Sequence, residues 1–371
     1  MTPIKIAIVH EWWTSFGGSE NTFLEMAKVF PEADLWVLYK DRNLTRTSDI
    51  EARLRESWMR FVPFHENRLI AAMFAPLAFH SLTLKKYDLV ISSSHTFAHM
   101  VKNLNDRGTV YFSYVYTPAR ALWLPNLDPR GRLLRKGIFP SLLKLLEKSS
   151  ASRLDAIASI SREVSLRVRN FWERDSVVIY PPVDLERTTS TLGEKPQDFS
   201  LGTKSYLLTA GRLVGYKNHQ FAILVAAEMN LPLVIMGTGP EQENLADKAK
   251  LSGVDTYFID APDDDTWNVI LQNAKALIFA GVEDFGITPI EAIAAGTPVF
   301  ALARGGALEY IQNGINGALI SELNPIFFAN EITNFNSSRQ AMRESVEKFS
   351  KEVFHRNFLS WVETEYAKLK P

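Results

Sequence analysis

Two short apolar runs with one helical segment between them constrain this chain more than any other feature. Residues 276–280 form the first run and residues 299–303 the second, and each is long enough for one buried strand. Between them, Thr288-Pro289 marks a helix start, because proline suits the first helical position, where its missing N–H would be unpaired anyway. Gly296 and Pro298 mark the end of that helix. The order strand, turn, helix, strand predicts part of a parallel α/β sheet.

The turn before this helix is the first candidate site. Residues 283–288 place backbone N–H groups at a helix N-terminus, which suits an anion such as a phosphate. Glu283 and Glu291 flank the turn, and carboxylates can accept paired hydrogen bonds from the hydroxyls of a sugar or a ribose. A plainer alternative is that Glu291 offsets the helix dipole and Glu283 is only a polar turn residue. The spacing alone leaves both possibilities open.

Composition narrows the class of protein. The 371 residues, 46% of them apolar, are enough for two domains with cores of their own. The absence of cysteine excludes disulfides and thiolate chemistry. The apolar run 4–9 is too short for a signal peptide, and no run reaches the roughly 20 residues that a membrane span needs. We therefore expect a soluble, cytoplasmic protein.

The charges are unevenly distributed along the chain. Residues 1–190 hold 26 Lys and Arg against 20 Asp and Glu, whereas the remainder holds 15 against 22. The excess in the N-terminal half favours an anionic partner or surface. It is too mild to indicate nucleic acid.

The N-terminal half begins as an α/β unit. Residues 4–9 form a strand, and the loop after it contains His10, Glu11, Gly17 and Gly18 before a helix that runs to Phe30. In open α/β sheets, ligands bind outside the carboxyl ends of the strands, so this loop is a candidate site. Further strands are expected at Leu35–Tyr39, Leu89–Ser92, Val110–Tyr114 and Ala156–Ser161.

A second α/β unit begins at Tyr206–Thr209. Arg212 and Lys217 follow this strand, just before a helix, and such cations can clamp a diphosphate. Taken alone, they fit two solvated surface cations better. Pro181-Pro182 and the polar residues 186–203 mark the boundary between the two halves.

Several motifs together resemble one known family. Glu283 and Glu291 lie within EDFGITPIEAIAAGTPV, which is followed by GGALE, and this stretch closely resembles the E-x7-E motif of retaining family 4 glycosyltransferases. GRLVGYKN, from Gly211 to Asn218, resembles their donor diphosphate clamp. The resemblance implies the GT-B fold: two Rossmann-like α/β domains that face each other across a cleft. It implies an acceptor domain 1–185, a linker 186–203, a nucleotide-sugar domain 204–350 and a helix 351–371 that crosses back onto the first domain.

The resemblance also implies roles for individual residues. Glu291 would hold the ribose hydroxyls and Glu283 the donor sugar, while Arg212, Lys217 and the turn amides would stabilise the leaving diphosphate. No metal and no cofactor are expected. The predicted catalytic residues are Glu283, Arg212, Lys217 and Tyr116; the predicted donor-binding residues are Gly18, Arg212, Lys217, Glu283, Phe285, Gly286, Ile287, Thr288 and Glu291; the predicted acceptor-binding residues are Gly17, His10 and Glu11.

Tyr116 departs from the family pattern. Related transferases usually have His-Thr-Pro where this chain has Tyr116-Thr117-Pro118, with the histidine at the donor sugar. A tyrosine hydroxyl can donate a hydrogen bond to a sugar oxygen, but its ordinary pKa near 10 does not suit proton shuttling at neutral pH. His95 or His99 is an alternative, although such histidines more often hydrogen-bond locally.

The donor and acceptor follow from the subgroup. The motifs look most like the mannosyltransferases of bacterial O-antigen assembly, which implies GDP-mannose as donor and a lipid-linked or soluble glycan as acceptor. Transfer from a UDP- or dTDP-sugar, a sugar-nucleotide epimerase of the same architecture and an inactive scaffold are the alternatives. No partner of the nucleic-acid class is expected.

Two segments interrupt the strand–helix rhythm. Residues 58–84 are rich in Phe, Met and Ala with few charges, and residues 130–148 are basic and amphipathic. The basic segment fits an ordinary helix packed on its domain. It also fits a peripheral contact with anionic lipid at the cytoplasmic membrane face.

Overall fold

The chain folds into two compact units. The computed structural model describes residues 4–14, 16–41, 49–63, 68–102, 108–125, 137–189 and 205–370. The first unit comprises residues 1–182 and 352–371, and the second comprises residues 183–351. Of the expected linker, residues 186–189 belong to the second unit, and residues 190–203 lie outside the described part of the chain.

The first unit is built on a parallel sheet of seven strands in the order β3-β2-β1-β4-β5-β6-β7. Each pair of neighbours is parallel. The central strands β1, β4 and β5 are almost entirely buried, as expected for a sheet covered on both faces. The strands are β1 Ile6–His10, β2 Asp34–Val37, β3 Leu54–Glu56, β4 Leu89–Ser94, β5 Val110–Val115, β6 Ala156–Ser159 and β7 Val177–Val178.

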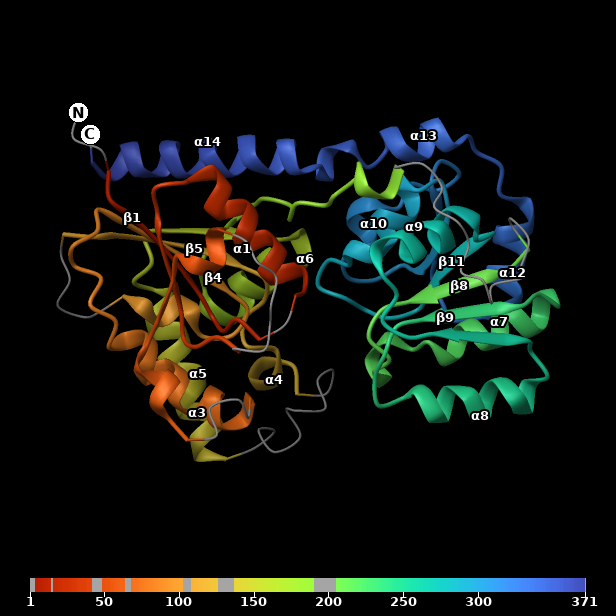
Figure 1. Cartoon of the computed structure of the whole chain (residues 1–371), viewed down its shortest axis with the longest axis horizontal. Coiled ribbons are helices and arrows are strands. Elements are labelled where there is room, and N and C mark those ends of the chain that lie inside the picture. Colours follow the sequence, from red (N-terminus) through yellow and green to blue (C-terminus); the bar gives the residue numbers. More distant parts are fainter. Residues whose placement is uncertain are drawn as a thin grey trace. The chain divides into compact units, whose positions relative to one another are not determined.

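Helices cover both faces of this sheet. Figure 1 shows α1 and α14 on one face and α3 and α5 on the other. The helices are α1 Gly18–Val29, α2 Asp49–Ala52, α3 Arg68–His80, α4 Arg120–Trp123, α5 Ile138–Ala151, α6 Arg162–Arg167 and α14 Lys351–Leu369; the short turns of other helical types include η1 Trp58–Phe61, η2 Ala98–Val101 and η4 Val168–Trp172.

The long C-terminal helix α14 packs on the first unit through aromatic rings. Phe358 lies 6.1 Å from Phe30 and 6.0 Å from Tyr114 between ring centroids, and Trp361 lies 5.2 Å from Phe112. Tyr114 and Phe112 are two residues apart on β5 and therefore point to the same face of the sheet. Buried aromatic side chains such as these dominate packing energetics, so α14 is an integral part of this unit.

The second unit repeats the same plan with six strands. Their order is β10-β9-β8-β11-β12-β13, and all neighbours are parallel. The strands are β8 Leu207–Ala210, β9 Leu233–Met236, β10 Thr256–Ile259, β11 Ala276–Phe279, β12 Val299–Leu302 and β13 Gly317–Ile320.

Helices also flank the second sheet. Phe221 on α7 and Phe328 on α12 meet with centroids 4.9 Å apart and form part of the core on one face. The helical segments are η5 Arg187–Thr189, η6 Gly215–Lys217, α7 Gln220–Met229, α8 Gln242–Ser252, α9 Asp264–Asn273, α10 Ile287–Ala294, α11 Ala307–Tyr310, α12 Pro325–Asn334, α13 Arg339–Glu344 and η7 Glu347–Phe349.

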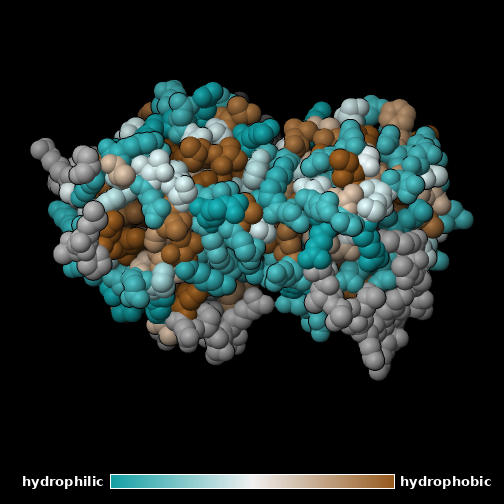
Figure 2. Space-filling model, turned by 90° about the horizontal axis from the view of Figure 1, so that it is seen from above, coloured by the Kyte–Doolittle hydropathy of each residue, from teal (hydrophilic) through white to brown (hydrophobic). Residues whose placement is uncertain are grey.

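These two parallel sheets confirm the α/β fold expected from the sequence. Residues 276–303 form strand, turn, helix and strand as predicted, with α10 beginning one residue earlier, at Ile287. In the described part of the chain, no helix combines the length and the apolar character needed to span a bilayer. The face in Figure 2 is mostly hydrophilic, with separate hydrophobic areas, which is ordinary for a protein surface.

Helix α5 differs from the ordinary packed helix because its acidic residue faces inward. Glu147 is fully buried, and its Oε1 accepts a hydrogen bond from the Ala119 backbone N–H at 2.9 Å. Its Oε2 accepts a hydrogen bond from the indole N–H of Trp123 on α4. Burial raises the pKa of the Glu147 carboxyl to about 8, although these hydrogen bonds act in the opposite direction. A largely protonated glutamate therefore joins α5 to α4.

The raised pKa of Glu147 predicts a stability that depends on pH. Because the folded state holds this proton more tightly than the unfolded chain does, the contribution is complete below about pH 4.5 and is lost as pH rises towards 8. Between these limits the unfolding free energy should fall by up to ~1.4 kcal/mol per pH unit. Glu147→Gln, which cannot ionise, should remove that slope in urea unfolding of the first unit. An unchanged slope would mean that Glu147 does not titrate in this range.

Candidate functional site

The strand order of the second unit defines where a ligand can bind. Strands β8 and β11 are neighbours in the sheet, and the chain proceeds from β8 to β9 on one side and from β11 to β12 on the other. Such a switch point leaves a crevice at the carboxyl ends of the two strands. The loop after β8 carries Arg212 and Lys217, and the loop after β11 carries Glu283 and Gly286. The sequence-predicted donor residues of this unit thus gather around the switch point.

An ion pair joins the two loops. The Lys217 ammonium lies 2.7 Å from Glu283 Oε1, and both side chains are largely buried. Two glycines make this approach possible. A Cβ on Gly211 would lie 2.8 Å from the Lys217 Nζ, and a Cβ on Gly281 would lie 2.7 Å from the Lys217 Cα. The backbone is therefore shaped so that the Lys217 side chain crosses Gly211 to reach the carboxylate.

The N-terminus of α10 lies open beside this pair. Gly286 precedes the helix with φ of 93°, a conformation that favours glycine, and no side chain caps the helix end. Gly286, Ile287 and Thr288 are half-buried, so their backbone groups can be reached from outside, whereas the Phe285 ring is buried. Uncapped N–H groups of this kind bind anions.

Tyr310 is a residue at this site that sequence reasoning missed. Its hydroxyl is buried, lies 2.9 Å from where a Cβ on Gly286 would be, and has no hydrogen-bond partner among the described residues. Burial and the nearby charges of Glu283 and Glu309 raise the pKa of Tyr310 well above its ordinary value, so the hydroxyl keeps its proton. Tyr310 lies on the short helix α11, and no local sequence pattern relates it to Gly286, so nothing in the sequence indicated a site residue.

The second predicted cation, Arg212, is exposed, and its backbone is held by a buried histidine. Its guanidinium donates a hydrogen bond to the Tyr216 hydroxyl at 3.0 Å. His219 contacts the Arg212 carbonyl through Nε2 at 3.1 Å and the Thr209 hydroxyl through Nδ1 at 2.8 Å. Burial lowers the pKa of His219 to about 4, so this ring is neutral at pH 7. It fixes the loop and adds no charge.

Glu291 has a partner that the sequence did not indicate. Arg187 donates a hydrogen bond to Glu291 Oε1 at 2.7 Å and another to Asp264 at 2.8 Å. Burial raises the pKa of the Glu291 carboxyl and the Arg187 charge opposes that rise. Arg187 lies 104 residues away, in a polar segment interpreted as a linker, and no local pattern marks it. Arg187 therefore orients the Glu291 carboxylate before any ligand hydroxyl binds to it.

In the first unit, a chain of hydrogen bonds connects three strand ends to α1. The Tyr116 hydroxyl donates to the Ser19 carbonyl at 3.0 Å and contacts the Ser93 hydroxyl at 2.9 Å, and Ser93 contacts His10 Nδ1 at 2.9 Å. Since a carbonyl can only accept, the Tyr116 proton is committed to Ser19, and Ser93 must donate to Tyr116. His10 must then donate to Ser93 from Nδ1–H. These directions leave Tyr116 without a proton to give to a sugar.

Glu20 lies beside this chain, next to the predicted Gly17-Gly18 turn. Its Oε2 accepts a hydrogen bond from the Ser19 hydroxyl at 2.8 Å and lies 3.0 Å from where a Cβ on Gly17 would be. Burial would raise the pKa of Glu20, but interactions with His10, His95 and the Ser19 hydroxyl outweigh it and lower this pKa to about 2. Gly17 is thus needed for close approach, and Gly18 begins α1.

The remaining predicted residues of this edge are less accessible. Glu11 is fully buried, and its Oε1 accepts hydrogen bonds from the backbone N–H groups of residues 96–98 at 2.8 to 2.9 Å. Burial lowers the pKa of His99 to about 3, and its ring packs on Trp172. His95 is half-buried, and its ring centroid lies 6.5 Å from that of Tyr116. Of the two alternative histidines, His95 is the one beside Tyr116.

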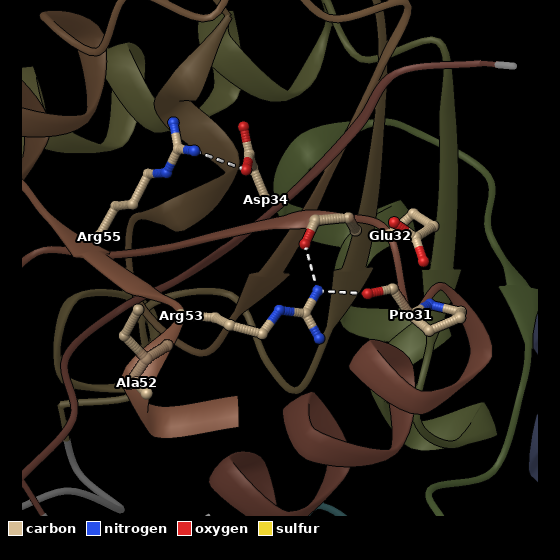
Figure 3. A pocket seen from close by; sticks show the side chains of 8 residues that line it. Pro31, Glu32, Asp34, Ala52, Arg53 and Arg55 are labelled. Carbon is tan, nitrogen blue, oxygen red and sulfur yellow. Dashed lines mark hydrogen bonds and ion pairs between the residues drawn. The ribbon is translucent and has the colours of Figure 1, made fainter. Parts of the chain in front are cut away.

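A surface pocket elsewhere in the first unit does not involve these residues. It has a volume of about 420 Å³ and lies at the amino-terminal ends of β2 and β3. Figure 3 shows that its two arginines are engaged: Arg53 donates to the Pro31 and Ala33 carbonyls, and Arg55 pairs with Asp34 at 2.8 Å. Among the described residues, no cluster of three or more His, Asp or Glu could hold a metal ion. That the protein works without a metal ion remains a prediction from the sequence.

Comparison with known proteins shows similarity to glycosyltransferases. Residues 194–353 match the family of glycosyl transferases group 1. In structure, the chain resembles HepE of Anabaena in complex with UDP, with a TM-score of 0.69 at 15% identity over 96% of this chain and 100% of that one. The fold is therefore that of the GT-B glycosyltransferases. Residues 194–353, less than half of the chain, are similar to the group 1 glycosyl transferases.

Two curated relatives have names that specify the sugar transferred. The alpha-1,3/1,6-mannosyltransferase ALG2 of Saccharomyces cerevisiae is 26% identical over 52% of this chain and 46% of its own length. The D-rhamnosyltransferase WbpZ of Pseudomonas aeruginosa is 26% identical over 58% of this chain and 54% of its own length. The chain spans about half the length of these curated relatives.

Tyr116→Phe tests the hydrogen-bond chain of the first unit. The Ser19 carbonyl would lose its donor and Ser93 its acceptor, which should cost about 1–3 kcal/mol of unfolding free energy. Backbone amides of the 17–20 turn should also exchange their hydrogens faster in deuterium exchange. Tyr366→Phe on α14, at a half-buried position of the same unit, is the control. Unchanged exchange in the turn would show that Tyr116 does not hold it.

Proposed function

We propose that the protein is a retaining glycosyltransferase that moves a hexose from a nucleotide-sugar to a hydroxyl of a glycan. The observation that carries the proposal is the Lys217–Glu283 ion pair beside the open N-terminus of α10, at the switch point of the second sheet. A cation, free backbone N–H groups and a carboxylate are the groups that a sugar diphosphate requires in one place.

The diphosphate is assigned to Lys217, Arg212 and the amides of residues 285–288. As the bond between the anomeric carbon and the phosphate oxygen breaks, negative charge grows on the leaving diphosphate. Fixed cations and amides stabilise that charge without reorganising, which is commonly a large term in catalysis. This set of groups needs no metal to neutralise the leaving group.

The two carboxylates are assigned to the sugar parts of the donor. Glu283 accepts hydrogen bonds from the transferred hexose, and Glu291, oriented by Arg187, accepts them from the ribose hydroxyls. The acceptor hydroxyl attacks the anomeric carbon from the face that the diphosphate leaves. Because attack and departure occur on the same face, the anomeric configuration is retained. The proton of the acceptor hydroxyl passes to the departing phosphate oxygen, which balances the charges.

The acceptor is assigned to the first unit, at the carboxyl end of its sheet. The loop after β1 contains Gly17 and Gly18, and the network of His10, Ser93 and Tyr116 fixes the start of α1 that follows. In this assignment Glu11, through Oε1, and Tyr116, through its hydroxyl, act by positioning the loop. The buried atoms His10 Nε2 and Glu11 Oε2 have no hydrogen-bond partner among the described residues. Tyr116 thereby takes a different role from the histidine usual at this place.

The preferred donor is GDP-mannose, and the preferred acceptor is a lipid-linked glycan of a bacterial surface polysaccharide such as an O-antigen. Similarity to a mannosyltransferase and a D-rhamnosyltransferase supports this choice. A UDP-sugar is the second candidate, because the structural neighbour HepE is described in complex with UDP. A cytoplasmic location, at the membrane face where such acceptors are assembled, follows from this assignment.

Substitution of Lys217 tests the diphosphate site. Lys217→Ala should weaken nucleoside diphosphate binding by about 1.5–3 kcal/mol, or about 10- to 150-fold, because a charge-assisted hydrogen bond is lost. The measurement is calorimetric titration with GDP, UDP, ADP and dTDP, without added metal. Lys250→Ala, at the exposed end of α8, is the matched control. Equal affinity of Lys217→Ala and wild type would remove Lys217 from the site.

Glu283→Gln separates binding from turnover. The substitution removes the negative charge 2.7 Å from Lys217, so affinity for the nucleoside diphosphate should hold or rise. Transfer should nevertheless fall by about 100-fold or more, since the carboxylate contact to the hexose is gone, and Glu283→Ala should abolish it. The readout is product formation from GDP-mannose and other nucleotide-sugars. Normal turnover would refute the role of Glu283.

The same assay distinguishes the proposed transfer from the two alternatives, an epimerase and an inactive scaffold. An epimerase would return a changed or hydrolysed sugar without any acceptor, and a scaffold would bind no nucleotide. Either result would overturn the proposed transfer.

A further inference from the structure

Helix α3 of the first unit has no polar face. Between Arg68 and His80 its sequence contains only apolar residues, and Ala71, Ala75 and Ala78 are buried. Met73, Phe74 and Leu77 are nevertheless exposed, Met73 at 67% and Leu77 at 61%. A helix that is apolar all around is normally covered on all sides. This helix is covered on one side only.

Helix α5 also presents apolar side chains to the solvent and an acidic side chain to the interior. Its buried side carries Glu147, whereas Leu142, Leu145 and Leu146 are exposed, Leu145 at 65%. The three leucines are three and four residues apart, so they lie on one face of the helix. An ordinary surface helix presents its charges outward and its leucines inward. The exposed leucines of α5 therefore indicate a face that meets an apolar medium.

The turn η1 adds aromatic residues to the same region. Phe61 is 72% exposed and Trp58 is partly exposed, and the Trp58 indole N–H donates to Ser81, just after α3, at 2.7 Å. The turn η2 contacts both α3 and α5, so the three elements are neighbours. Figure 1 shows α3 and α5 next to each other on one face of the first sheet. We call the exposed apolar residues of η1, α3 and α5 the apolar surface: Trp58, Phe61, Met73, Phe74, Leu77, Leu142, Leu145 and Leu146.

The charges at this surface have one sign. On the described side chains of η1, α3 and α5, those that are exposed or half-buried and charged are Arg60, Lys144 and Lys148, and the one acid, Glu147, is buried. The Arg60 guanidinium lies 4.4 Å from the Phe61 ring and the Lys144 ammonium 5.1 Å from the Trp123 ring, so both heads stay close to the apolar atoms. Lys148 pairs with Glu173 at 2.5 Å. Cations beside aromatic and leucine side chains complement the phosphates at the edge of a bilayer.

We propose that the apolar surface inserts into the headgroup region of an anionic lipid bilayer. The aromatic and aliphatic side chains enter the boundary of the acyl chains, while Arg60 and Lys144 contact lipid phosphates. Of the predicted basic segment 130–148, residues 130–136 lie outside the described part of the chain. The surface extends beyond the rest of that segment, because α3 and η1 supply its two most exposed side chains, Met73 and Phe61. It does not depend on the donor site, and it would hold the first unit at a membrane whatever the reaction.

A second copy of the chain fits these observations less well. A stable interface between copies needs about 800 Å² from each partner, with polar groups of both signs at its rim. Arg60 and Lys144, the two cations that lie against aromatic rings of this region, are both positive, so two copies would bring like charges together. An anionic bilayer satisfies both the apolar area and the charges.

Vesicle binding tests the proposal directly. The 371-residue chain is sedimented with phosphatidylcholine vesicles that contain either no phosphatidylglycerol or 30 mol% of it, the latter at about 0.05 and 0.5 M NaCl. We expect binding to the anionic vesicles, at least tenfold weaker binding without phosphatidylglycerol, and clear weakening at high salt. Absence of binding to anionic vesicles at low salt would overturn the proposal.

Variants locate the binding surface. The triple variant Phe61→Ser, Met73→Ser, Leu145→Ser should bind anionic vesicles at least tenfold more weakly, with an unchanged far-UV spectrum because all three side chains are exposed. Leu251→Ser on α8 of the second unit, where the leucine is 88% exposed, is the matched control and should bind as wild type does. Equal binding by the triple variant would overturn the proposal. So would a dimer in sedimentation equilibrium that the triple variant abolishes without any loss of lipid binding.

Discussion

The ion pair between Lys217 and Glu283 is the interaction on which the functional assignment depends. A partly buried pair costs desolvation, so it forms only where the backbone holds both groups in place. The strand order β9-β8-β11-β12 brings the two loops together, and Gly211 and Gly281 remove the side chains that would otherwise keep them apart. The N-terminus of α10 then adds backbone N–H groups that no side chain caps. A diphosphate bound there would replace the carboxylate as the partner of Lys217 and leave Glu283 for the sugar.

The first unit uses the same plan for a different purpose. Its loop after β1 is also at a switch point, and hydrogen bonds run from His10 through Ser93 and Tyr116 to the start of α1. Because the Ser19 carbonyl can only accept, the direction of each of these hydrogen bonds is determined, and together they hold the start of α1. The first unit thus supplies a loop held by hydrogen bonds, and the second unit supplies the charged groups Lys217 and Glu283.

Local patterns in the sequence were sufficient for the fold and for part of the site. The runs 276–280 and 299–303 are strands because apolar runs of that length between breakers have few alternatives. Glu283 and Lys217 were reached through the motifs around them, and the structure brings them to 2.7 Å. Arg187 and Tyr310 were missed, because their relation to the site arises from contacts between distant segments. The inward position of Glu147 was also missed, since helical periodicity places the leucines of α5 inside and a glutamate outside.

A crystal structure with a bound nucleoside diphosphate-hexose is the most direct measurement of the central claim. The account predicts the diphosphate at the N-terminus of α10, with Lys217 and Arg212 on its oxygens, Glu283 turned to the hexose and the ribose on Glu291. A donor bound elsewhere, with the Lys217–Glu283 distance still 2.7 Å, would contradict it.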